Sequence, residues 1–150
     1  RRCRDLLPAV QGAWSRQEMT PVRHFLSDGV FDRFSLQLEM QKGSGIRNDM
    51  RDVRVLDVRL AGSASDRFFD TLHVAITAEA VDTTAALADG RRLQGSGLAE
   101  RFTELWTFLR RPGAQTLTRP SLLEGCCPNC ETPLRASMSV PSTFTRIWSL

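Results

Sequence analysis

Three of the four cysteines lie close together near the C-terminal end, at Cys126, Cys127 and Cys130. Clustered cysteines are typical of metal binding or thiol chemistry in a reducing compartment more than of a disulfide framework. A structural zinc ion needs four tetrahedral ligands, and the pair Cys127 and Cys130 supplies two of them. Cys126 could add a third ligand, but no Cys or His follows Cys130. We therefore expect an incomplete site, which holds zinc only if a second chain lends ligands, and no other cofactor.

Among the acidic residues and histidines elsewhere in the chain, five lie on or near the predicted strands and are candidates for acid–base chemistry: Asp57, Asp70, His73, Glu79 and Glu104. A catalytic acid or base must point into an apolar cavity, where burial can move its pKa. His73 and Glu79 fall on the strand face opposite to the apolar residues, and Glu104 has no partner nearby in sequence. No nucleophile elbow, phosphate loop or His-x-x-His arrangement is present. The pattern predicts a protein that is not an enzyme, unless His73 meets Asp57 or Asp70 in a cavity.

Residues 100–113 form the stretch whose two faces are clearest. Strand periodicity, with successive side chains on opposite faces, gives both faces apolar groups. One face carries Phe102, Glu104, Trp106 and Phe108, and the other carries Thr103, Leu105, Thr107 and Leu109. A strand that is apolar on both sides is typical of the middle of a sheet. Whichever of Leu105 and Trp106 faces outward is expected to anchor an interface, such as that of a homodimer.

The N-terminal third has the apolar spacing of helices. Residues 5–17 form the first, with Asp5 as N-cap and Pro8 in the first turn, where a missing N–H costs nothing. Thr20-Pro21 is a second start signal, and Ser27-Asp28 is a third. The third helix ends at the glycines that follow Lys42.

After Asn48 the apolar period changes from that of a helix to that of a strand. The alternation slips by one position at Val55-Leu56, which is typical of a β-bulge in a bent strand. A second strand is expected in residues 67–82, and a short last one in residues 114–118. This order predicts an α+β fold, with N-terminal helices packed on a curved antiparallel sheet of about four strands.

The apolar face of the second strand suggests a pocket. Leu72, Val74 and Ile76 share this face, and we expect them to line a cavity together with Trp14 and Phe34 from the helices. An apolar cavity with few polar groups suits a lipid tail or an apolar segment of a partner protein. Arg59, Arg110 and Arg111 near its rim would meet anionic headgroups, at about 1 kcal/mol each close to a membrane surface.

The length of the chain, 150 residues, suits one domain that is large enough to bury a hydrophobic core. Its formal charge is +3, but the basic residues are scattered among Asp and Glu, which disfavours nucleic-acid binding. No stretch approaches the roughly 18 consecutive apolar residues of a membrane span, and no signal-peptide pattern is present. Because the sequence opens on Arg1, we expect it to be a piece of a longer protein.

Several spaced blocks resemble a known family. RDVRVLDVRL, RFFDTLHVAITAEAVD and RFTELWTFLRRPG, which follow Trp14 and the segment FLSDGVFDRF, resemble the C-terminal domain of the mitochondrial translocase subunit Tim44 and, more closely, bacterial proteins with that domain. The resemblance implies a cone-shaped fold of the nuclear-transport-factor-two-like superfamily over residues 1–118. It also implies tethering to membrane lipid or a protein partner, at the cytoplasmic face of a bacterial inner membrane or in the cytoplasm.

The tail, residues 119–150, carries a second resemblance. EGCCPNCETPL is similar to the first knuckle of a zinc ribbon, written Cys-Pro-x-Cys-Gly-x-Pro-Leu. Glu131 stands where that knuckle usually has the glycine that lets the chain turn under the metal. Three functions therefore follow from the sequence: a tethering domain linked to protein transport or lipid binding, a dimeric interaction module, or an isomerase or dehydratase of the same superfamily.

Overall fold

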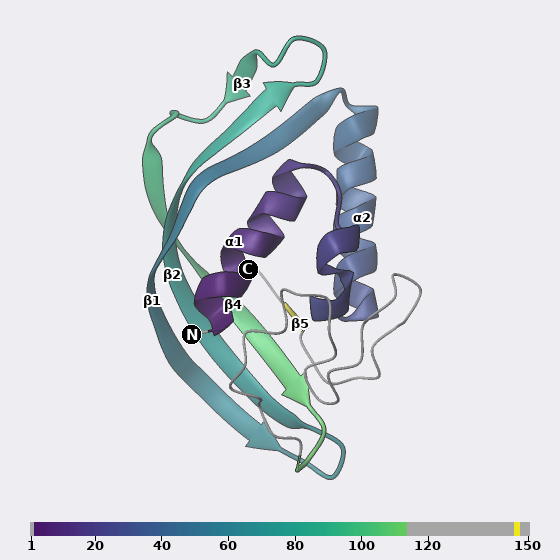
Figure 1. The fold of residues 1–150 in the computed structure, drawn as a ribbon, viewed down its shortest axis with the longest axis vertical. Coiled ribbons are helices and arrows are strands. Elements are labelled where there is room, and N and C mark those ends of the chain that lie inside the picture. The colour runs from purple at the N-terminus through teal and green to yellow at the C-terminus, as the bar shows by residue number, and fades with distance from the viewer. Residues whose placement is uncertain (1, 114–145, 148–150) are drawn as a thin grey trace.

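The computed structural model describes residues 2–113 and 146–147 (Figure 1). Within these residues, every helix precedes residue 46 and every strand follows it, as the change of period predicted. The elements in order are α1 (Arg2–Ser15), the 3-10 helix η1 (Thr20–Phe25), α2 (Asp28–Gly43), β1 (Ile46–Ser65), β2 (Asp70–Ala86), β3 (Arg92–Gln94), β4 (Ala99–Arg110) and β5 (Arg146–Ile147). The predicted α+β class is confirmed.

The strands form one antiparallel sheet in the order β1-β2-β4-β5, and β3 pairs with one end of β2. The centre of the sheet is β2, since β1 pairs with it on one side and β4 on the other. Residues 100–113 were expected in the middle of a sheet, and β4 does lie inside the strand order, between β2 and β5. Among the described residues its far edge pairs only with the two-residue β5, so β2 is the strand with long partners on both sides. The last strand expected in residues 114–118 lies outside the described residues.

The sheet curves around α1, and irregular pairing in β1 accounts for this (Figure 1). The register between β1 and β2 shifts at Arg51/Arg54, at Val55/Asp57 and at Leu60/Gly62. Asp52 also takes a left-handed backbone conformation, with φ of 55°. Bulges of this kind bend a strand and increase its twist. The slip expected at Val55-Leu56 is confirmed, and it is one of three.

The helix starts follow the sequence signals only in part. Ser27 caps α2, because its Oγ accepts a hydrogen bond from the Val30 N–H at 3.4 Å. Thr20-Pro21 does open a helix, but a 3-10 one, preceded by Met19 without a side-chain cap. The first helix begins at Arg2 instead of after Asp5, so Pro8 lies inside it and not in its first turn. Pro8 cannot donate the hydrogen bond that an interior position requires, and tertiary packing of α1 offsets that loss.

The core lies between the concave face of the sheet and the three helices. It includes Leu7 and Val10 from α1, Ile76 from β2 and Trp106 from β4, all buried. The inner face of β4 is the one that carries Trp106, so Leu105 faces outward, with 37% of its surface exposed. None of the helices formed by the described residues is both long and apolar enough to cross a membrane.

Removing the most buried contact of α1 should test this packing. Leu7→Ala is expected to lower the free energy of unfolding by about 2–5 kcal/mol, because the side chain is fully buried and leaves a cavity. Leu36→Ala is the matched control, since Leu36 is a helical leucine with 64% exposure and should change stability by about 0.5 kcal/mol or less. Urea denaturation followed by circular dichroism measures both. Equal losses would contradict the placement of α1 against the sheet.

Candidate functional site

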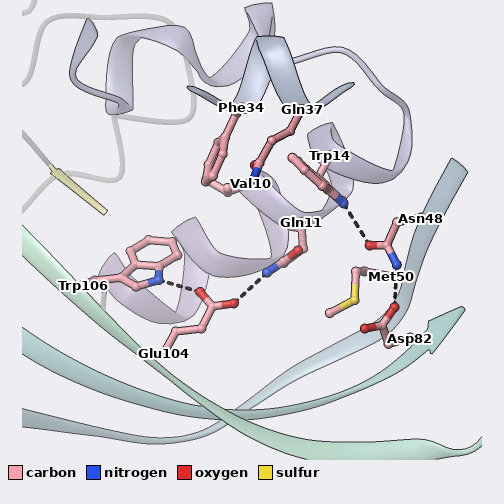
Figure 2. A pocket seen from close by; sticks show the side chains of 10 residues that line it. All are labelled: Val10, Gln11, Trp14, Phe34, Gln37, Asn48, Met50, Asp82, Glu104 and Trp106. Atoms are coloured by element: carbon pink, nitrogen blue, oxygen red, sulfur yellow. Dashed lines mark hydrogen bonds between the residues drawn. The ribbon is translucent and has the colours of Figure 1, made fainter. Parts of the chain in front are cut away.

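A cavity of about 330 Å³ opens between α1, α2 and the concave face of the sheet (Figure 2). Residues from five elements line it, so segments far apart in sequence build it together. They are Val10, Gln11 and Trp14 of α1, Phe34 and Gln37 of α2, Asn48 and Met50 of β1, Asp82 of β2, and Glu104 and Trp106 of β4. Half of these side chains are polar, so the cavity is amphipathic and not the purely apolar one expected from sequence.

Glu104 is the acidic group at the inner wall of the cavity. Gln11 Nε2 donates a hydrogen bond to its Oε1 at 3.0 Å, and Trp106 Nε1 donates one to its Oε2 at 2.6 Å (Figure 2). Burial raises the pKa of the Glu104 carboxyl above its ordinary value of 4.5, although the hydrogen bonds from Trp106 and Gln11 act in the opposite direction. Glu104 therefore takes up a proton more readily than an exposed glutamate does.

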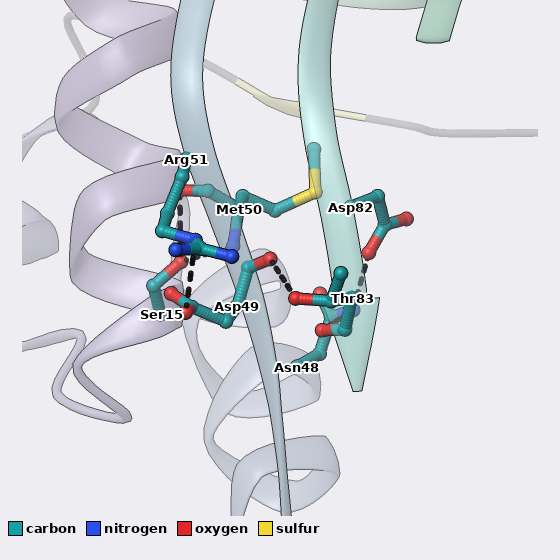
Figure 3. A network of polar contacts seen from close by, with 7 residues as sticks. All are labelled: Ser15, Asn48, Asp49, Met50, Arg51, Asp82 and Thr83. Carbon is teal, nitrogen blue, oxygen red and sulfur yellow. Dashed lines mark hydrogen bonds and ion pairs between the residues drawn. The ribbon is translucent and has the colours of Figure 1, made fainter. Parts of the chain in front are cut away.

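A second chain of hydrogen bonds fixes the opposite wall. Trp14 Nε1 donates to Asn48 Oδ1 at 2.9 Å, and Asn48 Nδ2 donates to Asp82 Oδ1 at 2.6 Å. Ser15, which follows Trp14 in α1, hydrogen-bonds to both backbone groups of Met50. Its Oγ accepts from the Met50 N–H at 2.7 Å and donates to the Met50 carbonyl at 3.3 Å (Figure 3). These contacts tie the last turn of α1 to β1 and β2, and so hold the Trp14 ring at the cavity.

The predicted pocket residues divide into two groups. Trp14 and Phe34 line the cavity, and their rings meet edge to face with centroids 5.6 Å apart. Val74 and Ile76 do not line it but are buried in the core beneath the helices. Leu72 lies nearer the β1–β2 turn and is 41% exposed. A substitution meant to fill the cavity therefore belongs on one of its lining residues and not at Val74.

Of the ten lining residues only Trp14 and Phe34 were predicted as pocket residues, and Gln11 and Glu104 are the most informative of those that the sequence pattern missed. Glu104 was expected to have no partner nearby in sequence, and its partner Gln11 is indeed 93 positions away, so the two side chains meet only in the fold. One signal was available. Glu104 shares the strand face of Phe102 and Trp106, and an ionisable group on a buried face needs an explanation.

His73 does not meet Asp57 or Asp70 in a cavity formed by the described residues. His73 is on the outer face, where its Nδ1 is 2.9 Å from Thr107 Oγ1. Asp57 forms an ion pair with Arg59 at 2.9 Å, and Asp70 forms one with Arg110 at 3.1 Å. Neither aspartate is near His73 in a cavity, so the condition that favoured an enzyme is not met here.

The three arginines expected at a membrane surface do not form one cluster. Arg59 pairs across the sheet with Ala75, five positions along β2 from Asp70, the partner of Arg110. That separation is roughly 17 Å along a strand. Carboxylates also neutralise two of the charges, through the ion pairs of Arg59 with Asp57 and of Arg110 with Asp70. Arg111 is exposed at the end of β4.

Metal and thiol sites are absent from the part of the chain that the structure describes. No three residues among its His, Cys, Asp and Glu side chains form a group that could hold a metal ion. The sulfhydryl of Cys3 is half-buried and free, and burial raises the pKa of this thiol, so little of it ionises at neutral pH. Cys126, Cys127 and Cys130 lie outside the described residues, and the shared zinc site stays a prediction.

An antiparallel sheet curved around N-terminal helices, with a cavity between them, defines the class of fold that the sequence blocks suggested. The family model for the Tim44-like domain matches residues 1–119. The chain therefore belongs to the Tim44-like family, whose domains are associated with membrane-linked protein translocation. Domains of this family interact with membrane or protein partners in that process.

Solved structures are also similar to this chain, among them one of a chloroplast protein. It is the crystal structure of the intermembrane space region of chloroplast protein ARC6, with a TM-score of 0.40 and 10% sequence identity, covering 72% of this chain and 85% of that one. The comparison with curated proteins gives no match.

The raised pKa of Glu104 predicts a specific dependence of stability on pH. Between 4.5 and its raised pKa the carboxyl binds more protons in the folded chain than in the unfolded one, so its contribution to stability is lost as pH rises through that window. Glu104→Gln keeps the shape and both hydrogen bonds once the Gln11 amide turns over. We expect the variant to gain stability relative to the parent as pH rises from about 4 to about 7.

Urea denaturation of both proteins across this pH range measures the difference. The pKa of Asp70 is lowered chiefly by a hydrogen bond from Ser65, so stability that depends on it falls as pH falls, but Asp70 is common to both chains and cancels. Parallel stability curves would show that Glu104 titrates alike in the folded and unfolded states.

Proposed function

We propose that this protein is a non-enzymatic binding domain in membrane-linked protein transport, and that its cavity holds an apolar part of a lipid or of a partner polypeptide. The observation that carries the proposal is the cavity itself, with the rings of Trp14, Phe34 and Trp106 in its walls. Its volume of about 330 Å³ lies at the lower end of the range of ligand pockets. A single side chain or a short acyl segment suits this size better than a large cofactor.

The hydrogen-bonding of the cavity supports binding more than catalysis. Both carboxylate oxygens of Glu104 already accept hydrogen bonds from protein donors, and Asp82 accepts one from Asn48. No Ser, Thr, Cys, His or Lys is among the described residues that line the cavity. A hydroxyl, thiol, imidazole or amine nucleophile would have to come from one of these residues, and the two carboxylates of the cavity already accept hydrogen bonds from protein donors. Turnover is therefore not part of this proposal.

Contact with an anionic membrane surface is a second part of the proposal, through Arg59, Arg110 and Arg111. The ion pairs with Asp57 and Asp70 leave little net charge at two of these positions, so the attraction should be weak and strongly dependent on salt. We propose the cytoplasmic face of the membrane or the cytoplasm as the place where the domain acts. A homodimer through the outward-facing Leu105 is the alternative, and gel filtration distinguishes it.

Filling the cavity should abolish binding of an apolar probe. Gln37 makes no hydrogen bond with another described residue, so Gln37→Trp places an indole in the cavity without breaking either network, at an overpacking cost of about 1–3 kcal/mol. We expect the affinity for Nile red, a neutral dye that fluoresces in apolar surroundings, to fall about tenfold or more, equivalent to about 1.4 kcal/mol.

Leu36→Trp is the matched control, because position 36 is the preceding residue of α2 but is exposed. It adds the same indole outside the cavity and should leave dye binding at the parent level. Circular dichroism verifies that both variants are folded. If Gln37→Trp binds the dye as well as the parent does, the apolar site is elsewhere and the proposed function fails.

A further inference from the structure

The cavity carries negative charge that no cation of the described residues balances. Glu104 and Asp82 are its ionisable lining residues, and no Lys, Arg or His lines it within the part of the chain described. Seven ion pairs connect other carboxylates to basic side chains, and neither Glu104 nor Asp82 takes part in any of them. Asp82 is exposed to water, but Glu104 is half-buried, and a half-buried carboxylate without a positive partner is costly. A cationic group in the cavity would remove that cost.

The hydrogen bonds of Glu104 leave room for one such group. Each carboxylate oxygen has two lone pairs, and each accepts one protein hydrogen bond, from Gln11 Nε2 on one side and Trp106 Nε1 on the other. One acceptor position per oxygen is therefore left. A carboxylate with one acceptor position left on each oxygen suits the two parallel N–H donors of a guanidinium, whereas an ammonium is a compact point charge.

The remaining walls suit the rest of an arginine side chain. Trp14, Phe34 and Trp106 supply aromatic surface on which a weakly hydrated planar guanidinium or its apolar stem packs favourably (Figure 2). Gln37 extends into the cavity from α2, and its amide, which bonds to no other described residue, supplies a further carbonyl acceptor. The cavity thus combines a carboxylate, aromatic walls and a neutral acceptor.

We propose that the cavity binds the side chain of an arginine on a partner polypeptide, with the Glu104 carboxylate as its counter-ion and the aromatic rings around its stem. This inference rests on the proposed function, because it names the chemistry of the guest that the cavity holds. It differs from lipid binding in one respect: recognition depends on the positive charge of the guest and on its planar shape.

Three short blocked peptides with neutral flanking residues test the inference. They differ at one central position, which is arginine, lysine or citrulline, the neutral analogue in which a urea replaces the guanidinium. Isothermal titration with the whole chain is expected to give an affinity for the arginine peptide about tenfold or more above that for the citrulline peptide, since hydrogen bonds to charged groups are the stronger ones. The lysine peptide should lie between them.

Glu104→Gln should abolish this selectivity, so that the arginine peptide binds no better than the citrulline peptide. Glu100→Gln is the matched control, because it removes a carboxylate from the same strand outside the cavity, and it should keep the full ratio of affinities. Gln37→Trp should weaken binding of the arginine peptide while Leu36→Trp should not.

Three outcomes would overturn the inference: equal binding of the arginine and citrulline peptides by the parent, equal binding of the arginine and lysine peptides, or selectivity that survives in Glu104→Gln. These three outcomes are independent of the binding of Nile red. If arginine selectivity is missing but the dye still binds, the cavity takes uncharged apolar guests. Loss of the proposed function itself would instead appear as dye binding that Gln37→Trp does not change.

Discussion

The packing of α1 against the concave face of the sheet is the contact on which the rest of the structure depends. Leu7, Ala13, Ile76 and Trp106 meet there and are almost wholly withdrawn from water. Burial of a side chain the size of Leu7 or Ile76 stabilises a fold by roughly 1.5–3 kcal/mol. The three register shifts in β1 give the sheet the curvature that lets a single helix contact strands on both sides of β2.

The cavity follows from a mismatch of lengths in this packing. The 14 residues of α1 span about 21 Å, whereas the 17 residues of β2 span about 57 Å. One helix therefore cannot cover the whole concave face, and η1 and α2 cover only part of what is left. Along the C-terminal half of α1 polar side chains face the cavity, and hydrogen bonds from Gln11, Trp14 and Ser15 bridge to β4 and β1.

The sequence predicts features that depend on neighbouring residues more reliably than features that depend on distant ones. The change of period after Asn48, the bulge at Val55-Leu56 and the cap at Ser27 are local, and all three are confirmed. Two other features depend on distant residues: which strand is central, and whether Val74 lines the cavity or is buried in the core. Both are set by which strands pair and by where the helix crosses them. Glu104 shows the limit, because the partner that gives it a role is 93 positions away.

The two networks at the cavity differ in how completely they satisfy their members. Asn48 uses its carbonyl for Trp14 and its amide for Asp82 and the Thr83 carbonyl, and the Asp82 carboxylate is exposed to water, so this wall is satisfied in both hydrogen bonding and charge. Glu104 is satisfied only in hydrogen bonding, since both of its donors are neutral.

An apolar residue at the inner-face position of Glu104 would remove the cost of burying a charge. Positions where a sequence departs from the rule for a buried strand face are those where function most often competes with stability. Among the described residues that line the cavity, Glu104 is the one where this conflict is sharpest, and it is the residue whose chemistry best distinguishes a selective site from a packing gap.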